Sequence, residues 1–115
     1  MDLKIMDMEK RGKIVPTRSL IKTPEQIEGI RRSGELNTAV LDEVARLIHP
    51  GMNTLEIDEI CSSYCTSHGG VAACRGYEGY PKGVCTSINE GVCHGIPKET
   101  DVLQEGDIVN VDFTT

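Results

Sequence analysis

Two residues in the last quarter of the chain are candidates for metal binding or acid–base chemistry. Asp112 lies in the β-prone run 108–113, where aspartate is disfavoured and where a carboxylate facing a packed layer is costly unless it is paired or binds a metal. His94 precedes Gly95, Ile96 and Pro97, which predicts a turn from which an imidazole can point into a cleft. The alternatives are a hydrogen-bonded strand carboxylate and a loop histidine bonded to backbone.

The cysteines and the other histidines give weaker signals. Five cysteines form an odd set in a chain without a signal-peptide core, so we expect reduced thiols rather than a disulfide framework. A structural zinc site is an alternative, because Cys61 and Cys65 are four residues apart and Cys93 adjoins a histidine. No C-x-x-C pair supports it, and buried free thiols are favoured. His49 and His68 are predicted to cap helix C-termini.

Residues 77–83 form a glycine-rich stretch that holds two of the four aromatic side chains, Tyr77 and Tyr80. Such a loop can form one wall of an apolar pocket. An ordinary surface loop is the alternative.

Two amphipathic helices are predicted in the first half of the chain. Thr23, Pro24 and Gln26 form a capping box, after which small and apolar residues recur at helical spacing until His49. Asn53 or Thr54 caps the second helix, which is expected to end near His68. The apolar stripe of the first helix comprises Ile27, Ile30, Gly34, Val40, Leu41, Val44, Leu47 and Ile48.

The second half of the chain predicts strands. Three β-prone runs, at 71–74, 84–88 and 108–113, are separated by Gly, Pro, Asn and Asp. In the last run Val109, Val111 and Phe113 alternate with Asn110 and Asp112, so the polar and apolar residues take opposite faces. Helices followed by strands indicate an α+β fold with the helices layered on an antiparallel sheet.

Composition limits the possible functions. The 115 residues fit one domain, and 18 acidic against 12 basic residues give a net charge of −6, which argues against a general nucleic-acid binder. No apolar run is long enough for a membrane span, and a cytoplasmic location is predicted. Residues 1–19 are predicted to be a flexible arm. The basic character of residues 1–22 leaves contact with RNA or the ribosome as an alternative to a solvated tail.

Five ordered segments resemble the N-terminal half of a type I (bacterial-type) methionine aminopeptidase, the metalloenzyme that removes initiator methionine. The resemblance covers about residues 20–115 and implies the pita-bread fold, with two α/β halves around a dinuclear metal site. The implied cofactors are two divalent ions (Co, Mn, Fe or Zn), and the implied substrates are nascent polypeptide N-termini. The segments are Ile21–Ile27, Gly79–Lys82, Val84–Glu90, Val92–Pro97 and Glu105–Asp112.

The same resemblance implies roles for single residues. His94 matches a histidine that contacts the substrate near the scissile bond, and Asp112 matches the first of five metal ligands. Glu78 departs from the family pattern, because bacterial relatives often carry histidine there. The methionine pocket is matched by Tyr77, Tyr80, Cys85 and Cys74, and the backbone carbonyls of a monovalent cation site are matched by Asn89 and Gly91.

The chain ends at Thr115, before the positions of the other four ligands. The resemblance therefore implies a truncated catalytic domain that is inactive alone, within a full-length parent that is usually monomeric. A non-catalytic peptide- or protein-binding module on a metal-less half of the fold is the alternative function.

Overall fold

The computed structural model describes residues 3–115 and divides into two compact units. The first unit ends at Ile30, and the second comprises Arg31–Thr115. Residues 1 and 2, which belong to the predicted arm of residues 1–19, lie outside the described residues.

The first unit contains α1 (Leu3–Lys10), a 3-10 turn (Arg18–Leu20) and the first turns of α2 (Pro24–Leu47). Residues 1–19 were predicted to be a flexible arm, and the structure differs in placing the helix α1 within it. Leucine, lysine, methionine and glutamate all favour helices, and an ion pair between Arg11 and Asp7 (3.0 Å) supports this one. Gly12, at φ 71°, follows its end. None of the side chains of α1 is buried.

The start of α2 has the predicted capping box. The Thr23 hydroxyl accepts a hydrogen bond from Gln26 N (3.2 Å), and the Gln26 side chain accepts one from Thr23 N (2.9 Å). The helix ends at Leu47, just before His49, as predicted. His49 itself does not cap the helix, because its ring nitrogen contacts the Pro50 carbonyl (2.7 Å) rather than a helix carbonyl.

The predicted apolar stripe of α2 is buried only in its second half. Val40 and Val44 are 0% and 4% exposed, whereas Ile27 and Ile30 are 49% and 59% exposed. The predicted helical spacing is thus present, but only part of the stripe is buried. Periodicity identifies a face that can be buried, and burial also needs a neighbouring element at the same position along the helix. Within the second unit, the α3 and strand residues that form the core reach only the later turns.

Helix α3 (Thr54–Ser67) begins at Asn53, which forms a capping box with Glu56. Its buried face includes Ile57, Cys61 and Cys65. At the other end, the His68 ring contacts the Tyr64 carbonyl oxygen (2.8 Å), which confirms the predicted histidine cap. Burial raises the pKa of Cys61 to about 12, so this thiol packs as a small neutral side chain.

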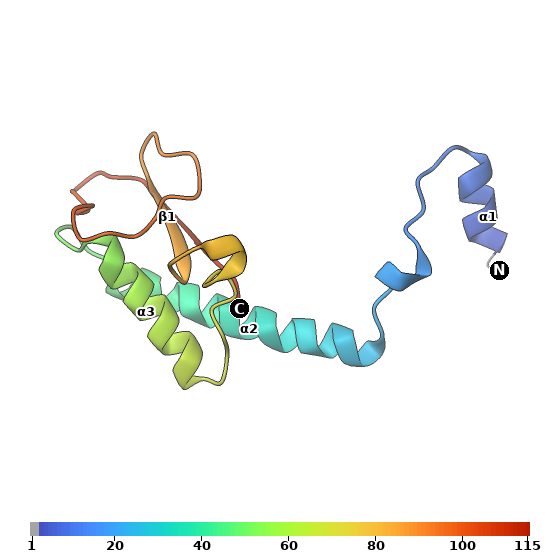
Figure 1. Cartoon of the computed structure of the whole chain (residues 1–115), viewed down its shortest axis with the longest axis horizontal. Coiled ribbons are helices and arrows are strands. Elements are labelled where there is room, and N and C mark those ends of the chain that lie inside the picture. The colour runs from blue at the N-terminus through green and yellow to red at the C-terminus, as the bar shows by residue number, and fades with distance from the viewer. Residues whose placement is uncertain (1–2) are drawn as a thin grey trace. The chain divides into compact units, whose positions relative to one another are not determined.

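Strands β1 (Val84–Ile88) and β2 (Val109–Phe113) form a two-stranded antiparallel sheet. Val84 lies opposite Phe113, and Cys85 lies opposite Asp112. Cross-strand partners share a face, so one face is apolar and packs on α3, while the other carries polar groups. Figure 1 shows the connection between the strands extending beyond them. An isolated bridge between Asn53 and Val102 ties this connection to the start of α3.

The predicted strand at 71–74 is absent. Ala72 instead accepts a backbone hydrogen bond from Arg75 N (3.2 Å), which turns the chain, and Val71 is 77% exposed. One sheet-like bond remains, from Ala73 N to the Thr114 carbonyl (2.8 Å). Local β propensity was overridden here by the turn that leads to the next segment.

Candidate functional site

The segment between Arg75 and Gly83 forms a tight, strained turn. Gly76 N donates to the Tyr80 carbonyl (2.8 Å) and closes the turn. Inside it Glu78 has φ 48°, a left-handed conformation that costs a non-glycine residue free energy. Such strain persists only where surrounding contacts hold it, so this turn is a built feature of the chain.

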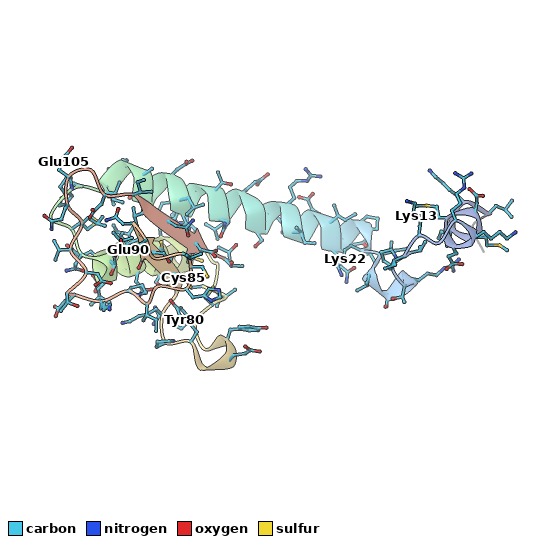
Figure 2. The ribbon with its side chains drawn as sticks, turned by 90° about the horizontal axis from the view of Figure 1, so that it is seen from above. Lys13, Lys22, Tyr80, Cys85, Glu90 and Glu105 are labelled. Carbon is cyan, nitrogen blue, oxygen red and sulfur yellow. The ribbon has the colours of Figure 1, made fainter. Side chains whose placement is uncertain are left out.

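A cavity of about 570 Å³ opens beside this turn. Its wall combines two aromatic rings, two thiols and an imidazole, and its size is within the range of about 300–1,000 Å³ typical of small-molecule sites. Figure 2 shows Tyr80 at the opposite end of the second unit from Glu105. The five residues predicted to contact substrate all line it: Cys74, Tyr77, Tyr80, Cys85 and His94.

His94 lines the cavity and has φ 57°. The next residue holds it there: Gly95 O accepts from Thr86 N (2.9 Å), and Gly95 N donates to the Ser87 hydroxyl (3.2 Å). A Cβ on Gly95 would overlap the Thr86 carbonyl oxygen, so only glycine lets the chain lie this close to β1. The close contact fixes the backbone from which the imidazole projects.

Tyr80 has a structural role as well as a lining one. Its hydroxyl lies 2.9 Å from the Val84 carbonyl and 3.3 Å from the Gly95 carbonyl, and it donates to this pair. Burial, followed by the nearby Cys85, raises the pKa of Tyr80 above its ordinary value. The phenol therefore stays protonated and joins the turn to the segment that carries His94.

Asp112 is exposed on β2 and lies directly across from Cys85, a cavity residue. Its carboxylate is thus on the polar face of the sheet, next to the cavity. Within residues 3–115 no three His, Cys, Asp or Glu side chains gather closely enough to hold a metal ion. One exposed carboxylate is a suitable ligand for a divalent ion but does not make a site, so the described residues do not fit a complete metal centre.

Asn89 and Gly91 lie at the other end of β1 and line a second cavity of about 510 Å³. Asn89 has φ 51°, and its amide holds that conformation by donating to Asp107 (2.8 Å) and accepting from Ile108 N (3.0 Å). The Asn89 bond lowers the pKa of Asp107. The structure does not bring Asn89 and Gly91 to the first cavity, and their cation-binding role stays a prediction.

Asp58, a buried carboxylate on α3 that is 4% exposed, was not predicted from the sequence. It accepts hydrogen bonds from Gly83 N (2.7 Å) and from Arg75 (3.5 Å), at the two ends of the turn. A signal was available, because Asp58 follows Thr54 by four residues and precedes Cys61 by three, which places it on the buried face. Ser87 and Ile96 were also missed.

Comparison with known proteins places the chain in a family. Residues 28–115 match the model of metallopeptidase family M24. The chain belongs to this family. It is 52% identical over 95 residues to the methionine aminopeptidase of Escherichia coli K12, covering 82% of this chain and 36% of that protein. It is 48% identical over 89 residues to methionine aminopeptidase A of Synechocystis, covering 77% and 35%. The chain thus spans about a third of the length of the curated relatives it matches.

Solved structures of methionine aminopeptidases also match this M24 chain. The methionine aminopeptidase of Rickettsia prowazekii matches with a TM-score of 0.77 and 39% identity, over 81% of this chain and 37% of that one. The Thermotoga maritima enzyme matches with a TM-score of 0.79 and 36% identity, over the same shares of 81% and 37%. A Xaa-Pro dipeptidase from Bacillus anthracis shares the fold alone (TM-score 0.67, 20% identity).

These matches confirm the predicted resemblance and the α+β fold, with its two helices on an antiparallel sheet as part of a pita-bread architecture. M24 is a family of metallopeptidases, so metal dependence is a property of the family to which the chain belongs. No helix among residues 3–115 has the length and apolar character needed to cross a membrane.

Proposed function

We propose that this chain forms the substrate pocket and part of the catalytic machinery of an aminopeptidase that removes initiator methionine from nascent proteins. The observation that carries the proposal is the single cavity lined by all five predicted substrate residues. Aromatic faces and thiols suit a methionine side chain, since thioethers make favourable contacts with aromatic rings. The chain's similarity to named methionine aminopeptidases supports the same substrate.

In this proposal His94 contacts the peptide beside the bond to be cleaved. An imidazole there can donate a hydrogen bond to a substrate carbonyl or move a proton. The bonds from Gly95 to Thr86 and Ser87 restrict where that imidazole can lie. Tyr80, through its bond to the Gly95 carbonyl, links occupancy of the pocket to the position of His94.

The finer family expectations belong to the proposal as well. Asp112 contributes one ligand to a pair of divalent ions (Co, Mn, Fe or Zn), and the backbone carbonyls of Asn89 and Gly91 bind a monovalent cation. The protein acts in the cytoplasm as a monomer, with the ribosome as a further partner. Its catalytic part begins near residue 20, after an arm of residues 1–19.

A non-catalytic peptide-binding module is the second candidate. The observation behind it is the first cavity itself, which can receive a side chain whether or not a metal is bound. The pocket would then hold an N-terminal side chain without cleavage.

A chimera separates the two candidates. In the E. coli enzyme, the segment that aligns with this chain over 95 residues is replaced by the corresponding segment of this chain. Release of methionine from Met-Ala-Ser by the chimera is then measured with Mn²⁺ or Co²⁺. We expect metal-dependent release that His94→Ala lowers severely and bound metal that Asp112→Asn lowers. A folded chimera that binds metal as its parent does, yet releases no methionine, would favour the binding module.

A further inference from the structure

Asp58 is an acidic residue buried in a helix, outside every motif that carries the family resemblance. It is 4% exposed, between the buried residues Ile57 and Cys61 on α3. A buried carboxylate is costly unless it is hydrogen-bonded and paired. The hydrogen-bond partners of Asp58 therefore indicate its role.

Both carboxylate oxygens of Asp58 bind the same short segment. Oδ1 accepts from Gly83 N at 2.7 Å, and Oδ2 accepts from an Arg75 guanidinium nitrogen at 3.5 Å. The same nitrogen donates to the Ser62 hydroxyl at 3.1 Å, one helical turn further along α3. Arg75 and Gly83 are the first and last residues of the turn that forms the cavity wall, so one carboxylate holds both ends of that turn.

Gly83 packs closely against α3. A Cβ there would lie 2.6 Å from Ser62 Oγ, 3.2 Å from Ala72 Cβ and 3.3 Å from Asp58 Oδ1. A larger residue at this position would therefore require the Ser62 side chain to move. The next residue, Val84, begins β1, and its carbonyl receives the Tyr80 hydroxyl (2.9 Å).

We propose that Asp58 is a positioning residue that fixes the wall of the cavity by holding Arg75 and Gly83 together. The enclosed turn carries Tyr77 and Tyr80, and its left-handed residue, Glu78, does not hold that conformation without support. A short charge-assisted bond to Gly83 N at one end and a longer ion pair with Arg75 at the other supply that support. What the pocket holds rests on the proposed function, but the contacts of Asp58 with Arg75 and Gly83 do not.

The test uses the full chain and the two cavity thiols, Cys74 and Cys85. Iodoacetamide labelling is followed by peptide mass spectrometry, with exposed Cys93 and buried Cys61 as internal references. Loss of the Asp58 contacts should let the cavity wall open locally, and the frequency of local opening sets the labelling rate of a buried thiol. Asp58→Ala is expected to raise the labelling of Cys85 relative to Cys93 about tenfold, with Cys61 still protected.

Two milder variants keep the test decisive if Asp58→Ala fails to fold and Cys61 becomes labelled. Asp58→Asn retains an oxygen for Gly83 N but loses the ion pair, and Arg75→Ala removes the other partner of that pair, whose side chain is 52% exposed. Each is expected to raise Cys85 labelling about threefold. The double variant should go no further than Arg75→Ala alone, because Arg75→Ala already removes the ion pair as well as the bond to Ser62. The matched control is Glu59→Gln, the same charge change one residue along on an exposed position.

Unchanged labelling of Cys74 and Cys85 in Asp58→Asn and Arg75→Ala would overturn the proposal, and so would an equal change in Glu59→Gln. Binding of Met-Ala-Ser to the same variants gives a separate result. If the unaltered chain does not bind the peptide, the proposed function fails while the labelling result stands. If it binds, the dissociation constant is expected to rise with the labelling rate across the variants.

Discussion

Asn89 and His94 both have a positive φ, and this conformation is stabilised in different ways at the two residues. The connection that precedes β1 contains one non-glycine residue at positive φ, Glu78, and the connection that follows it contains two, Asn89 and His94. Glu78 and His94 line the first cavity, and Asn89 lines the second. Asn89 stabilises its own conformation, because its amide bonds to Asp107 and Ile108. His94 is held by bonds that its neighbour Gly95 makes to β1.

This difference separates a structural turn from a candidate site. Where a side chain supports its own backbone, as at Asn89, its polar groups are used by the fold. Where other residues supply the support, as at His94, the side chain can project toward a ligand. Strain supported from outside is the arrangement expected at functional sites, and it distinguishes the cavity end from the Asn89 end.

The largest expected effect is at Gly95. Gly95→Ala would drive a methyl group into the Thr86 carbonyl oxygen and should lower the free energy of unfolding by about 3 kcal/mol or more. Urea denaturation measures this. Gly34→Ala is the control, since nothing lies within 4 Å of its Cβ, and removing a helical glycine should stabilise by about 0.5–1 kcal/mol. Equal effects of the two substitutions would show that the close approach of Gly95 to the Thr86 carbonyl does not require a glycine.

The next largest loss of stability is expected from substitution of Asn89. Asn89→Ala removes two side-chain hydrogen bonds and leaves a residue at φ 51° that tolerates it poorly. We expect a loss of about 1–2 kcal/mol in unfolding free energy, with Asn89→Gly recovering part of it. The labelling of Cys85 should not change. Faster labelling would show that the two ends of β1 are not independent.

Tyr80→Phe tests the link between the cavity turn and His94. It removes the hydroxyl that bonds to the Val84 and Gly95 carbonyls but keeps the ring in the wall. The expected loss is about 1 kcal/mol in unfolding free energy. NMR shifts of the Gly95 and His94 amides should move, whereas those of Asn89 and Asp107 should not. Movement confined to the Asn89 end would contradict the assignment of this hydroxyl.

The smallest effect concerns pH at the Asn89 end. The pKa of Asp107 is lowered, first by the Asn89 hydrogen bond and then by the bond from Gln104 N. Its contribution to stability is therefore present above the ordinary carboxyl pKa of about 3.9 and is lost as the pH falls through the lower folded-state value. Denaturation curves between about pH 5 and pH 2 should have a shallower pH dependence in Asn89→Ala. An unchanged slope would contradict this.

Local signals predicted much of the fold. The capping box at Thr23, the cap at Asn53 and the alternation in 109–113 all depend on neighbours in sequence, and all are present. Other features depend on tertiary neighbours. Which part of the α2 stripe is buried, and whether residues 71–74 form a strand, are decided by the elements that pack alongside, and a single sequence does not specify that.

The candidate site was predicted mainly by resemblance. Tyr77, Tyr80 and His94 line one cavity as that resemblance implied, but composition alone left each with an ordinary structural alternative. The residues that hold them were missed: Asp58 and Ser87 act through contacts with residues far along the chain or in a neighbouring segment. Helical spacing alone could have placed Asp58 on the buried face.

The central claim is that the cavity beside the turn binds a methionine side chain. An NMR titration of the ¹⁵N-labelled chain with Met-Ala-Ser, compared with Ala-Ala-Ser, tests it most directly. The account predicts saturable shifts at the amides of Gly79, Tyr80, Cys85 and Ile96 for the methionine peptide only, with the amide of Asn89 unmoved. Shifts of equal size with both peptides, or shifts confined to the Asn89 end, would contradict it.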